Sequence, residues 1–243
     1  MADPTKGVIL ITGSNRGIGL EMVRQLASSA ATVIATCRRP DEADDLHELA
    51  DAHTDTVDVL QLDVTDPDAI SGARSMVEER YGALNLLINN AGVNGGGTAD
   101  TFDHVDMETL MHTFQVNAAA PHIMTRAFAS LLKAGAADGN SAVVNITSQL
   151  GSITNTKGRG TWQSYKASKA ALNMLSRLEA HELRADGVVV VAMHPGWVQT
   201  DMGGSNARLT PEASVSGILD VVRSLSPDDA GRFLTHDGSE LPW

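Results

Sequence analysis

The sequence is poor in cysteine, in positive charge and in long apolar runs, and each shortage excludes a class of protein. Its one cysteine, Cys37, excludes an intrachain disulfide and any metal site built from several cysteines. The formal net charge of −12 disfavours nucleic acid and anionic membranes as partners, because both are bound through basic surfaces. No run approaches the roughly 18 apolar residues of a membrane span, so we expect no membrane partner. The opening MADPTKGVILITG has too short an apolar run for a signal peptide, which favours a cytoplasmic protein.

What is present is an ordinary globular composition in one continuous chain. Of the 243 residues, 42% are hydrophobic and 20% are charged, which allows a substantial core. No internal repeat, low-complexity tract or long linker divides the chain. We therefore expect a single domain over residues 1–243.

Strand-like and helix-like patterns alternate along this chain. Six short runs are apolar and rich in β-branched residues, and a weaker seventh follows: 7–13, 31–37, 57–63, 83–92, 141–148, 187–196 and 231–238. Helical patterns lie between them at 17–29, 41–52, 67–81, 107–133, 163–185 and 211–225. Continuous apolar runs of strand length are typical of a parallel sheet covered on both faces. The alternation predicts an α/β fold, a Rossmann-type doubly wound sheet of about seven parallel strands with helices on both faces.

In such a sheet, ligands bind at the carboxyl ends of the strands, and the first strand ends in the glycine-rich turn TGSNRGIG. The glycine spacing differs from the common dinucleotide pattern G-x-G-x-x-G, but the physical basis is shared. Glycines let the backbone approach a pyrophosphate, and the following helix presents free N–H groups to it. The alternative is a glycine-rich turn without a ligand, which the position directly after the first strand disfavours. The residues assigned to a dinucleotide here are Gly13, Asn15, Arg16, Gly17, Ile18 and Gly19.

The end of the second strand favours NADP(H) over NAD(H). About 20 residues after the glycines, dinucleotide folds commonly carry an acid that holds the ribose hydroxyls. Here that place, 18 residues beyond Gly19, holds Cys37, followed by Arg38 and Arg39. A carboxylate would repel a 2′-phosphate, whereas a guanidinium can bind it with two hydrogen bonds. We expect Arg16 to reach the same phosphate, so that three arginines converge; the alternative is a solvated pair of arginines that ends a strand.

Three further strand ends carry candidate cofactor contacts. Asp63 and Val64 are placed to hold an adenine ring, although an acid after a strand is also a common helix cap. The motif NNAG follows the fourth strand, where Asn89 is expected to tie neighbouring strands together and small residues leave room for a ribose. The motif HPGWVQT closes the sixth strand, and its backbone is expected to meet a carboxamide; the glycine-rich run after it, 201–212, is a candidate lid. The residues assigned from these two motifs are Asn90, Ala91, Gly92, Pro195, Gly196, Val198 and Thr200.

Asn117 lies four residues before Pro121 within a helical pattern. Proline has no N–H group, so the carbonyl of Asn117 loses its usual partner and the helix is expected to kink. A buried carbonyl needs a partner, and our hypothesis is a water bound there that links toward Lys169. The alternative is an ordinary proline kink, which leaves the carbonyl unpaired.

Ser148, at the end of the fifth strand, and the pair Tyr165 and Lys169 form the candidate catalytic group. Residues four apart share one face of a helix, so the phenol and the ammonium should point the same way. A free tyrosine has a pKa near 10, and a neighbouring cation would stabilise the phenolate and lower that pKa. We predict that Lys169 tunes Tyr165 as an acid; the alternative is an amphipathic helix with incidental polar residues.

The remaining signals concern the substrate pocket, and they disfavour a metal site and a serine hydrolase. Trp162, Trp197 and Met202 are predicted to line an apolar pocket beside Ser148 and Tyr165, which favours aromatic or medium-chain carbonyl compounds. The eight histidines show no metal-ligand spacing, and no serine lies in a G-x-S-x-G elbow.

The chain resembles the short-chain dehydrogenase/reductase family over essentially its full length. The resemblance rests on TGSNRGIG, NNAG, Asn117, Ser148, Tyr165 with Lys169, and PGWVQT, in that order. The segments ITGSNRGIGL, CRRP, HPGWVQTDMGG and FLTHDGSELPW are similar to the sniffer/C-factor branch of carbonyl reductases. One departure is the long segment 149–163 between Ser148 and Tyr165, which usually borders the substrate pocket.

The resemblance implies a catalytic tetrad of Asn117, Ser148, Tyr165 and Lys169 and an NADPH-dependent reduction of an aldehyde or ketone. It also implies a homodimer or homotetramer formed through the helices at 107–133 and 163–185. Two alternatives remain: an NADP-binding sensor or signalling protein with little turnover, and an enzyme that oxidises alcohols in the cell. Steady consumption of NADPH with a carbonyl compound would separate an enzyme from a sensor.

Overall fold

The apolar runs of the sequence form one sheet of seven parallel strands, which confirms the predicted fold. The computed structural model describes residues 3–137, 139, 141–158 and 160–243. Neighbouring strands follow the order β3-β2-β1-β4-β5-β6-β7, and every pair is parallel. The strands are β1 Val8–Thr12, β2 Thr32–Cys37, β3 Val57–Gln61, β4 Leu86–Asn89, β5 Ser141–Ile146, β6 Val188–His194 and β7 Phe233–Thr235. The order reverses direction between β1 and β4, which is where doubly wound sheets bind ligands.

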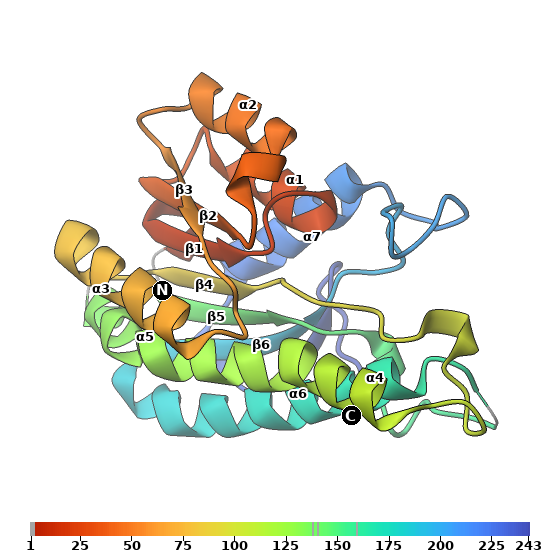
Figure 1. The fold of residues 1–243 in the computed structure, drawn as a ribbon. Helices are drawn as coiled ribbons and strands as arrows, with labels where there is room; N and C mark the ends of the chain where they lie inside the picture. Colours follow the sequence, from red (N-terminus) through yellow and green to blue (C-terminus); the bar gives the residue numbers. More distant parts are fainter. Residues whose placement is uncertain (1–2, 138, 140, 159) are drawn as a thin grey trace.

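Helices cover both faces of this sheet (Figure 1). The helices are α1 Gly17–Leu26, α2 Asp44–Ala52, α3 Pro67–Tyr81, α4 Met107–Phe114, α5 Ala120–Ala137, α6 Gln163–Leu183 and α7 Pro211–Ser224. One core joins α1, α2 and α7 to the sheet, and a second core joins α3, α5 and α6 to the opposite face. Neighbouring residues of β1 divide between the two cores: Ile9 and Ile11 belong to the first and Leu10 to the second. All three side chains are fully buried, which explains why the strand sequences are continuously apolar.

Local sequence signals set the ends of several helices. Asp66 caps α3 by accepting hydrogen bonds from the N–H groups of Asp68 and Ala69, and Pro67 begins the helix. The same helix ends at Gly82, whose φ of +69° is a left-handed conformation that glycine adopts without strain. Thr210 caps α7 in the same way, before Pro211. In both α3 and α7, a capping side chain followed by proline marks the start of the helix.

The predicted helix over 107–133 is divided in the structure. A π-helical segment, Gln115–Ala119, separates α4 from α5, and the N–H of Ala120 bonds to the carbonyl of Gln115. Pro121 explains the change, because a residue without an N–H group cannot continue the regular ladder and its ring crowds the preceding turn. The sequence predicted a kink here, and at this place the structure has one wide turn, which carries Asn117.

Two classes of feature are absent from the part of the chain that the structure describes. None of its helices is both long and apolar enough to cross a membrane. Within the same residues, no group of three or more His, Cys, Asp or Glu side chains is arranged to hold a metal ion.

Candidate active site

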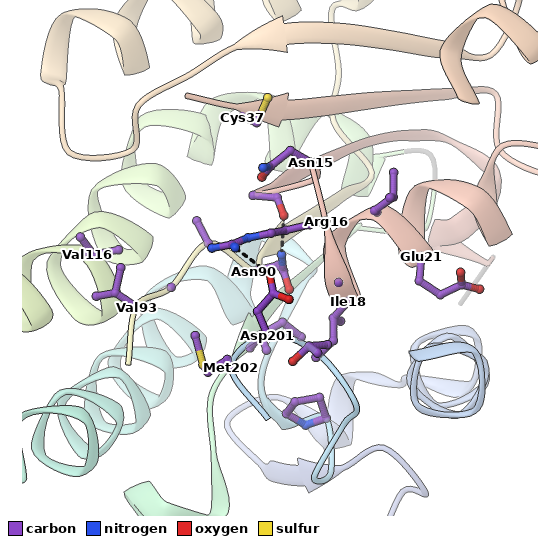
Figure 2. A pocket seen from close by; sticks show the side chains of 18 of the residues that line it. Asn15, Arg16, Ile18, Glu21, Cys37, Asn90, Val93, Val116, Asp201 and Met202 are labelled. Carbon is purple, nitrogen blue, oxygen red and sulfur yellow. Dashed lines mark hydrogen bonds and ion pairs between the residues drawn. The ribbon is translucent and has the colours of Figure 1, made fainter. Parts of the chain in front are cut away.

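One cavity of about 520 Å³ lies at the carboxyl edge of the sheet (Figure 2). Its walls come from segments that follow β1, β2, β3, β4 and β6 and from α6. Figure 2 shows Cys37, at the end of β2, in the upper part of the view and Met202, beyond β6, in the lower part, with Asn15 and Arg16 of the glycine turn between them. The volume is typical of small-molecule sites. An elongated ligand could therefore contact the glycine turn and α6 at the same time.

The glycine turn leaves the start of α1 open to this cavity. Gly13 and Gly17 have φ angles of +69° and +56°, in the left-handed region that favours glycine. Gly19 faces inward, because a β-carbon there would lie 2.2 Å from the carbonyl oxygen of Gly13. The residue before the helix, Arg16, makes no side-chain cap hydrogen bond, so no side chain occupies the donors of the first turn. A helix terminus without a side-chain cap, lined by glycine, fits a pyrophosphate.

The NNAG segment is tied to the glycine turn by hydrogen bonds. The Asn90 amide donates to the carbonyl oxygens of Thr12 and Gly13 at 2.9 and 3.0 Å. The Thr12 hydroxyl in turn accepts from the N–H groups of Asn90 and Ala91, both at 3.0 Å. Asn90 therefore holds the two walls of the cavity together. Sequence reasoning missed Thr12, although a hydroxyl residue at the last position of β1 was a usable signal.

Asn89 makes the cross-strand contact expected of it. Its amide donates to the Asn145 side-chain oxygen at 2.8 Å and so links β4 to β5. Asn145 then donates to Ser176 and Glu179 of α6, each at 2.9 Å. The buried amides thus connect the centre of the sheet to the helix that carries Tyr165.

The three arginines do not all converge on one point. Arg38 lines the cavity and makes no ion pair within the described residues. Arg16 also lines it, but its guanidinium pairs with Asp201 at 2.7 Å. The prediction that Arg39 joins them is wrong, because the short helix after β2 places Glu42 three residues away and Arg39 pairs with it at 2.8 Å, away from the cavity lining.

Asp63 and Val64 lie on the cavity wall beside Arg38. The Asp63 carboxylate accepts hydrogen bonds from the Thr65 backbone at 2.9 Å and from its hydroxyl at 2.7 Å. Burial opposes ionisation, but these hydrogen bonds and the Arg38 charge outweigh it and hold the pKa of Asp63 below its usual value. A charged acceptor is therefore maintained at this end of the cavity.

Tyr165 and Lys169 share the cavity-facing side of α6. The Lys169 ammonium lies 5.8 Å from the centre of the Tyr165 ring, as residues four apart on one helix should. Lys169 is only 4% exposed, and its nitrogen donates to the Ile146 carbonyl at 2.8 Å. Both residues line the cavity, so the candidate catalytic pair and the glycine turn meet the same space.

The pKa values of this pair differ from the sequence-based expectation. Burial raises the pKa of Tyr165 to about 12, against a smaller opposing effect of its hydrogen bond with Ser148. Burial also lowers the pKa of Lys169 to about 7. The Tyr165 pKa is therefore raised and not lowered as expected, because removal from water disfavours the charged form of both groups. At neutral pH the phenol keeps its proton.

Asn117 clamps the segment after β4 against α6. Its side-chain oxygen accepts from the Val93 N–H at 2.8 Å, and its amide donates to the Val93 carbonyl at 2.8 Å and to the Ser168 hydroxyl at 3.1 Å. Ser168 donates in turn to the Tyr165 carbonyl at 2.8 Å. The side chain of Asn117 is thus fully engaged, and the water proposed at its main-chain carbonyl stays a prediction.

Of the expected substrate wall, Tyr165 and Met202 line the cavity and the other residues do not. Ser148 is buried next to Thr147, which does line it. Trp162 packs edge-on against the Tyr165 ring, with 5.9 Å between the ring centres. The Trp197 indole donates to the Gly203 carbonyl at 2.8 Å and is about half exposed. The two tryptophans therefore support the residues of the site from outside the cavity.

Most predicted cofactor residues line the cavity and three do not. Those that line it are Gly13, Asn15, Arg16, Gly17, Ile18, Arg38, Asp63, Val64, Asn90, Ala91, Gly92, Tyr165, Lys169, Pro195 and Thr200. Gly19 packs inside the glycine turn, Gly196 packs against Leu209 with a φ of +84°, and Val198 is buried in a bridge with Leu209. Sequence reasoning did not assign several other lining residues, such as Val93, Val116, Ile146, Gln199, Asp201 and Glu212.

Comparison with known proteins gives a consistent result. The short chain dehydrogenase family model matches residues 7–209. The C-signal protein of Myxococcus xanthus is 43% identical over 162 residues, which cover 67% of this chain and 94% of that protein. The structure of NADPH-bound carbonyl reductase from chicken fatty liver is 40% identical, with a TM-score of 0.91, and the match covers 97% of this chain and 98% of that one. Carbonyl reductase Sniffer of D. melanogaster is 33% identical, with a TM-score of 0.92, over 98% and 100% of the two chains.

Proposed function

The chain belongs to the short-chain dehydrogenase family as an NADP-dependent oxidoreductase of the carbonyl reductase type, and we propose that it reduces an aldehyde or ketone to an alcohol with Tyr165 as the proton donor. The observation that carries the proposal is that one cavity contains the glycine turn, Tyr165 and the buried Lys169. NADPH, when bound, supplies the hydride to the carbonyl carbon. The chain must then deliver one proton to the carbonyl oxygen.

Tyr165 is suited to that proton transfer because burial keeps its phenol protonated at neutral pH. As the carbonyl oxygen gains negative charge, it becomes a stronger base than the phenolate and takes the proton. Ser148, which lies close enough to Tyr165 to lower its pKa, holds the carbonyl oxygen near the phenol. Lys169, with a pKa of about 7, holds or releases a proton near neutral pH and donates to the ribose hydroxyls of the bound dinucleotide. A water on the Asn117 carbonyl resupplies the proton.

The preference for NADP(H) over NAD(H) is part of the proposal. Arg38 lines the cavity at the end of β2, where an acid would hold ribose hydroxyls and a guanidinium instead favours a 2′-phosphate. The substrate is a small uncharged carbonyl compound, aromatic or of medium chain length, bound beside Met202. We also propose association into a homodimer or homotetramer through the helices at 107–133 and 163–185, which are α4, α5 and α6; light scattering of the purified protein would test the oligomeric state.

The central experiment is a substrate screen with both reduced cofactors. Purified protein is mixed with aldehydes, ketones and reactive dicarbonyls in the presence of NADPH or NADH, and cofactor oxidation and alcohol formation are followed. We expect steady NADPH oxidation with at least one carbonyl compound and slower turnover with NADH. Tight NADPH binding without turnover of any compound would contradict the proposal.

A second candidate is an NADP-binding sensor or signalling protein with little turnover. The similarity to the protein named C-signal favours it. The complete set of Asn117, Ser148, Tyr165 and Lys169 argues against it, because a pure sensor has no need of a protonated phenol beside the nicotinamide site. The same screen separates the two, since a sensor binds NADPH and does not consume it.

A further inference from the structure

Helix α6 begins without a cap of its own. Its N-cap residue, Trp162, makes no side-chain cap hydrogen bond. Trp162 also has a φ of +64°, and within the described part of the chain it is the one non-glycine residue with a positive φ. A bulky side chain in this conformation is strained, and such strain persists only where surrounding contacts hold it. The contacts that hold the start of α6 must therefore come from elsewhere in the chain.

They come from the segment that follows β4. The Trp162 N–H bonds to the Gly97 carbonyl at 3.2 Å, and the Gln163 N–H bonds to the Asp100 carbonyl at 3.4 Å. The Ser164 N–H bonds to a carboxylate oxygen of Asp100 at 2.6 Å, although the two residues are 64 positions apart. Three N–H groups that a helix start leaves unpaired are thus satisfied by this one segment. Asp100 provides two of the three acceptors.

The setting of Asp100 is unusual for a cap. Asp100 is only 3% exposed, whereas the Asp66 cap of α3 lies at the surface. Its second carboxylate oxygen has no hydrogen-bond partner within the described residues, and neither has the buried Ser164 hydroxyl. A carboxylate at a helix N-terminus gains from the helix dipole, which offsets part of the cost of burial. Asp100 is therefore a buried acid with one oxygen bonded to the first turn of α6 and the other unpaired within the described residues.

That geometry concerns Tyr165 directly. Ser164, held by Asp100, is the residue before Tyr165, and Trp162 packs against the Tyr165 ring. On the other side, the Ser168 hydroxyl donates to the Tyr165 carbonyl and accepts from the Asn117 amide. Asp100 itself does not line the cavity. It lies behind the first turn of α6, and any unwinding of that turn would move the phenol away from Lys169.

We propose that Asp100 is a positioning residue that caps α6 from a distance and so fixes the Tyr165 phenol for proton transfer. The inference rests on the proposed reductase function for its kinetic consequence. Its structural consequence does not depend on that function, because the cap must also protect the first-turn amides of α6 from exchange with solvent.

The test compares Asp100→Ala, Asp100→Asn and the matched control Asp66→Ala. The control removes the cap of α3, a helix that does not line the cavity. For each full-length variant we measure kcat, KM and NADPH affinity, together with hydrogen exchange of the amides of 163–165. Asp100→Ala should lower kcat by up to about 100-fold, because a small misplacement of a reacting group has effects of this order. NADPH affinity should change little, and the α6 amides should exchange faster.

The conservative variant keeps the test decisive if Asp100→Ala folds poorly. The amide oxygen of Asp100→Asn can still accept from the Ser164 N–H, so kcat and slow exchange should be largely restored. The control should lower thermal stability and leave kcat and the α6 amides unchanged. The proposal is overturned if Asp100→Ala leaves exchange at 163–165 unchanged, or if Asp100→Asn restores slow exchange and not kcat. Failure of the proposed function would look different, since the unmodified protein would then consume no NADPH.

Discussion

Helices α1 and α6 both start at the carboxyl edge of the sheet without a side-chain cap of their own, and their N-termini differ in what faces the first-turn N–H groups. At α1 the N-cap residue is Arg16, and the glycine turn leaves the first-turn donors facing the cavity. At α6 the N-cap residue is Trp162, and Asp100 from a distant segment closes the terminus. An open terminus can bind an anionic ligand, whereas a closed one can hold its side chains in place. The first arrangement suits binding of a cofactor, and the second suits chemistry on a substrate.

The largest expected effect is the loss of kcat when Tyr165, on α6, is replaced. Tyr165→Phe removes the proton donor and keeps the ring that packs against Trp162, so kcat should fall by roughly 10²- to 10⁴-fold while NADPH affinity changes little. Steady-state kinetics and direct titration with NADPH separate the two quantities. The matched control is Tyr81→Phe, because Tyr81 hydrogen-bonds Asp58 and does not line the cavity. Near-normal reduction by Tyr165→Phe would assign the proton transfer to another group.

The next effect concerns the pH dependence of stability of the nucleotide-free protein. Burial lowers the pKa of Lys169 from 10.5 to about 7, so between these values the unfolded chain binds one more proton than the folded chain. The free energy of unfolding should therefore rise with pH in this window, by at most about 1.4 kcal/mol per pH unit, relative to a variant without the group. Below pH 7 both states are protonated, and the cost of burying the ammonium is fully present.

Chemical denaturation of the wild type and of Lys169→Met at several pH values between 7 and 9.5 measures this difference. The upper limit keeps Tyr165 mostly protonated in both states, since its pKa lies near 10 when unfolded and about 12 when folded. Subtracting the variant removes the contribution of all other titrating groups. A difference that does not change with pH would mean that Lys169 keeps its charge in the folded protein.

The cofactor side provides the third prediction. Arg38→Ala should weaken NADPH binding by about 10- to 100-fold, which corresponds to loss of a charge-assisted contact with the 2′-phosphate, and should leave NADH binding nearly unchanged. The control is Arg39→Ala, because Arg39 pairs with Glu42 away from the cavity lining. Calorimetric titration with both cofactors gives the comparison. Equal losses for NADPH and NADH would place Arg38 away from the 2′-phosphate.

The sequence predicted those parts of the site that are set by residues close together along the chain. The apolar runs identified the strands, the glycines marked the turn after β1, and the spacing of Tyr165 and Lys169 put them on one face of α6. Each of these follows from a periodicity or from residues close together in the chain.

What the sequence did not predict depends on burial and on distant contacts. The pKa of Tyr165 rises because folding removes the phenol from water. Asp100 carries no motif, because its partner Ser164 is 64 residues away. Arg39 follows Arg38 directly, yet Glu42 turns it aside. Sequence patterns show which residue types are available, and folding decides which of them face the ligand.

The smallest expected effect concerns the ion pair that crosses the cofactor cavity. Arg16 pairs with Asp201, and both side chains are largely exposed, so the pair itself contributes little to stability, about 1 kcal/mol at most. Asp201→Asn should free Arg16 for a phosphate and tighten NADPH binding by up to about fivefold, with a gain that shrinks as salt is added. The matched control is Glu42→Gln, which breaks the exposed pair with Arg39. If Asp201→Asn instead weakened NADPH binding, the pair would be holding the wall of the cavity in place, and the start of α1 would depend on a distant acid as the start of α6 does.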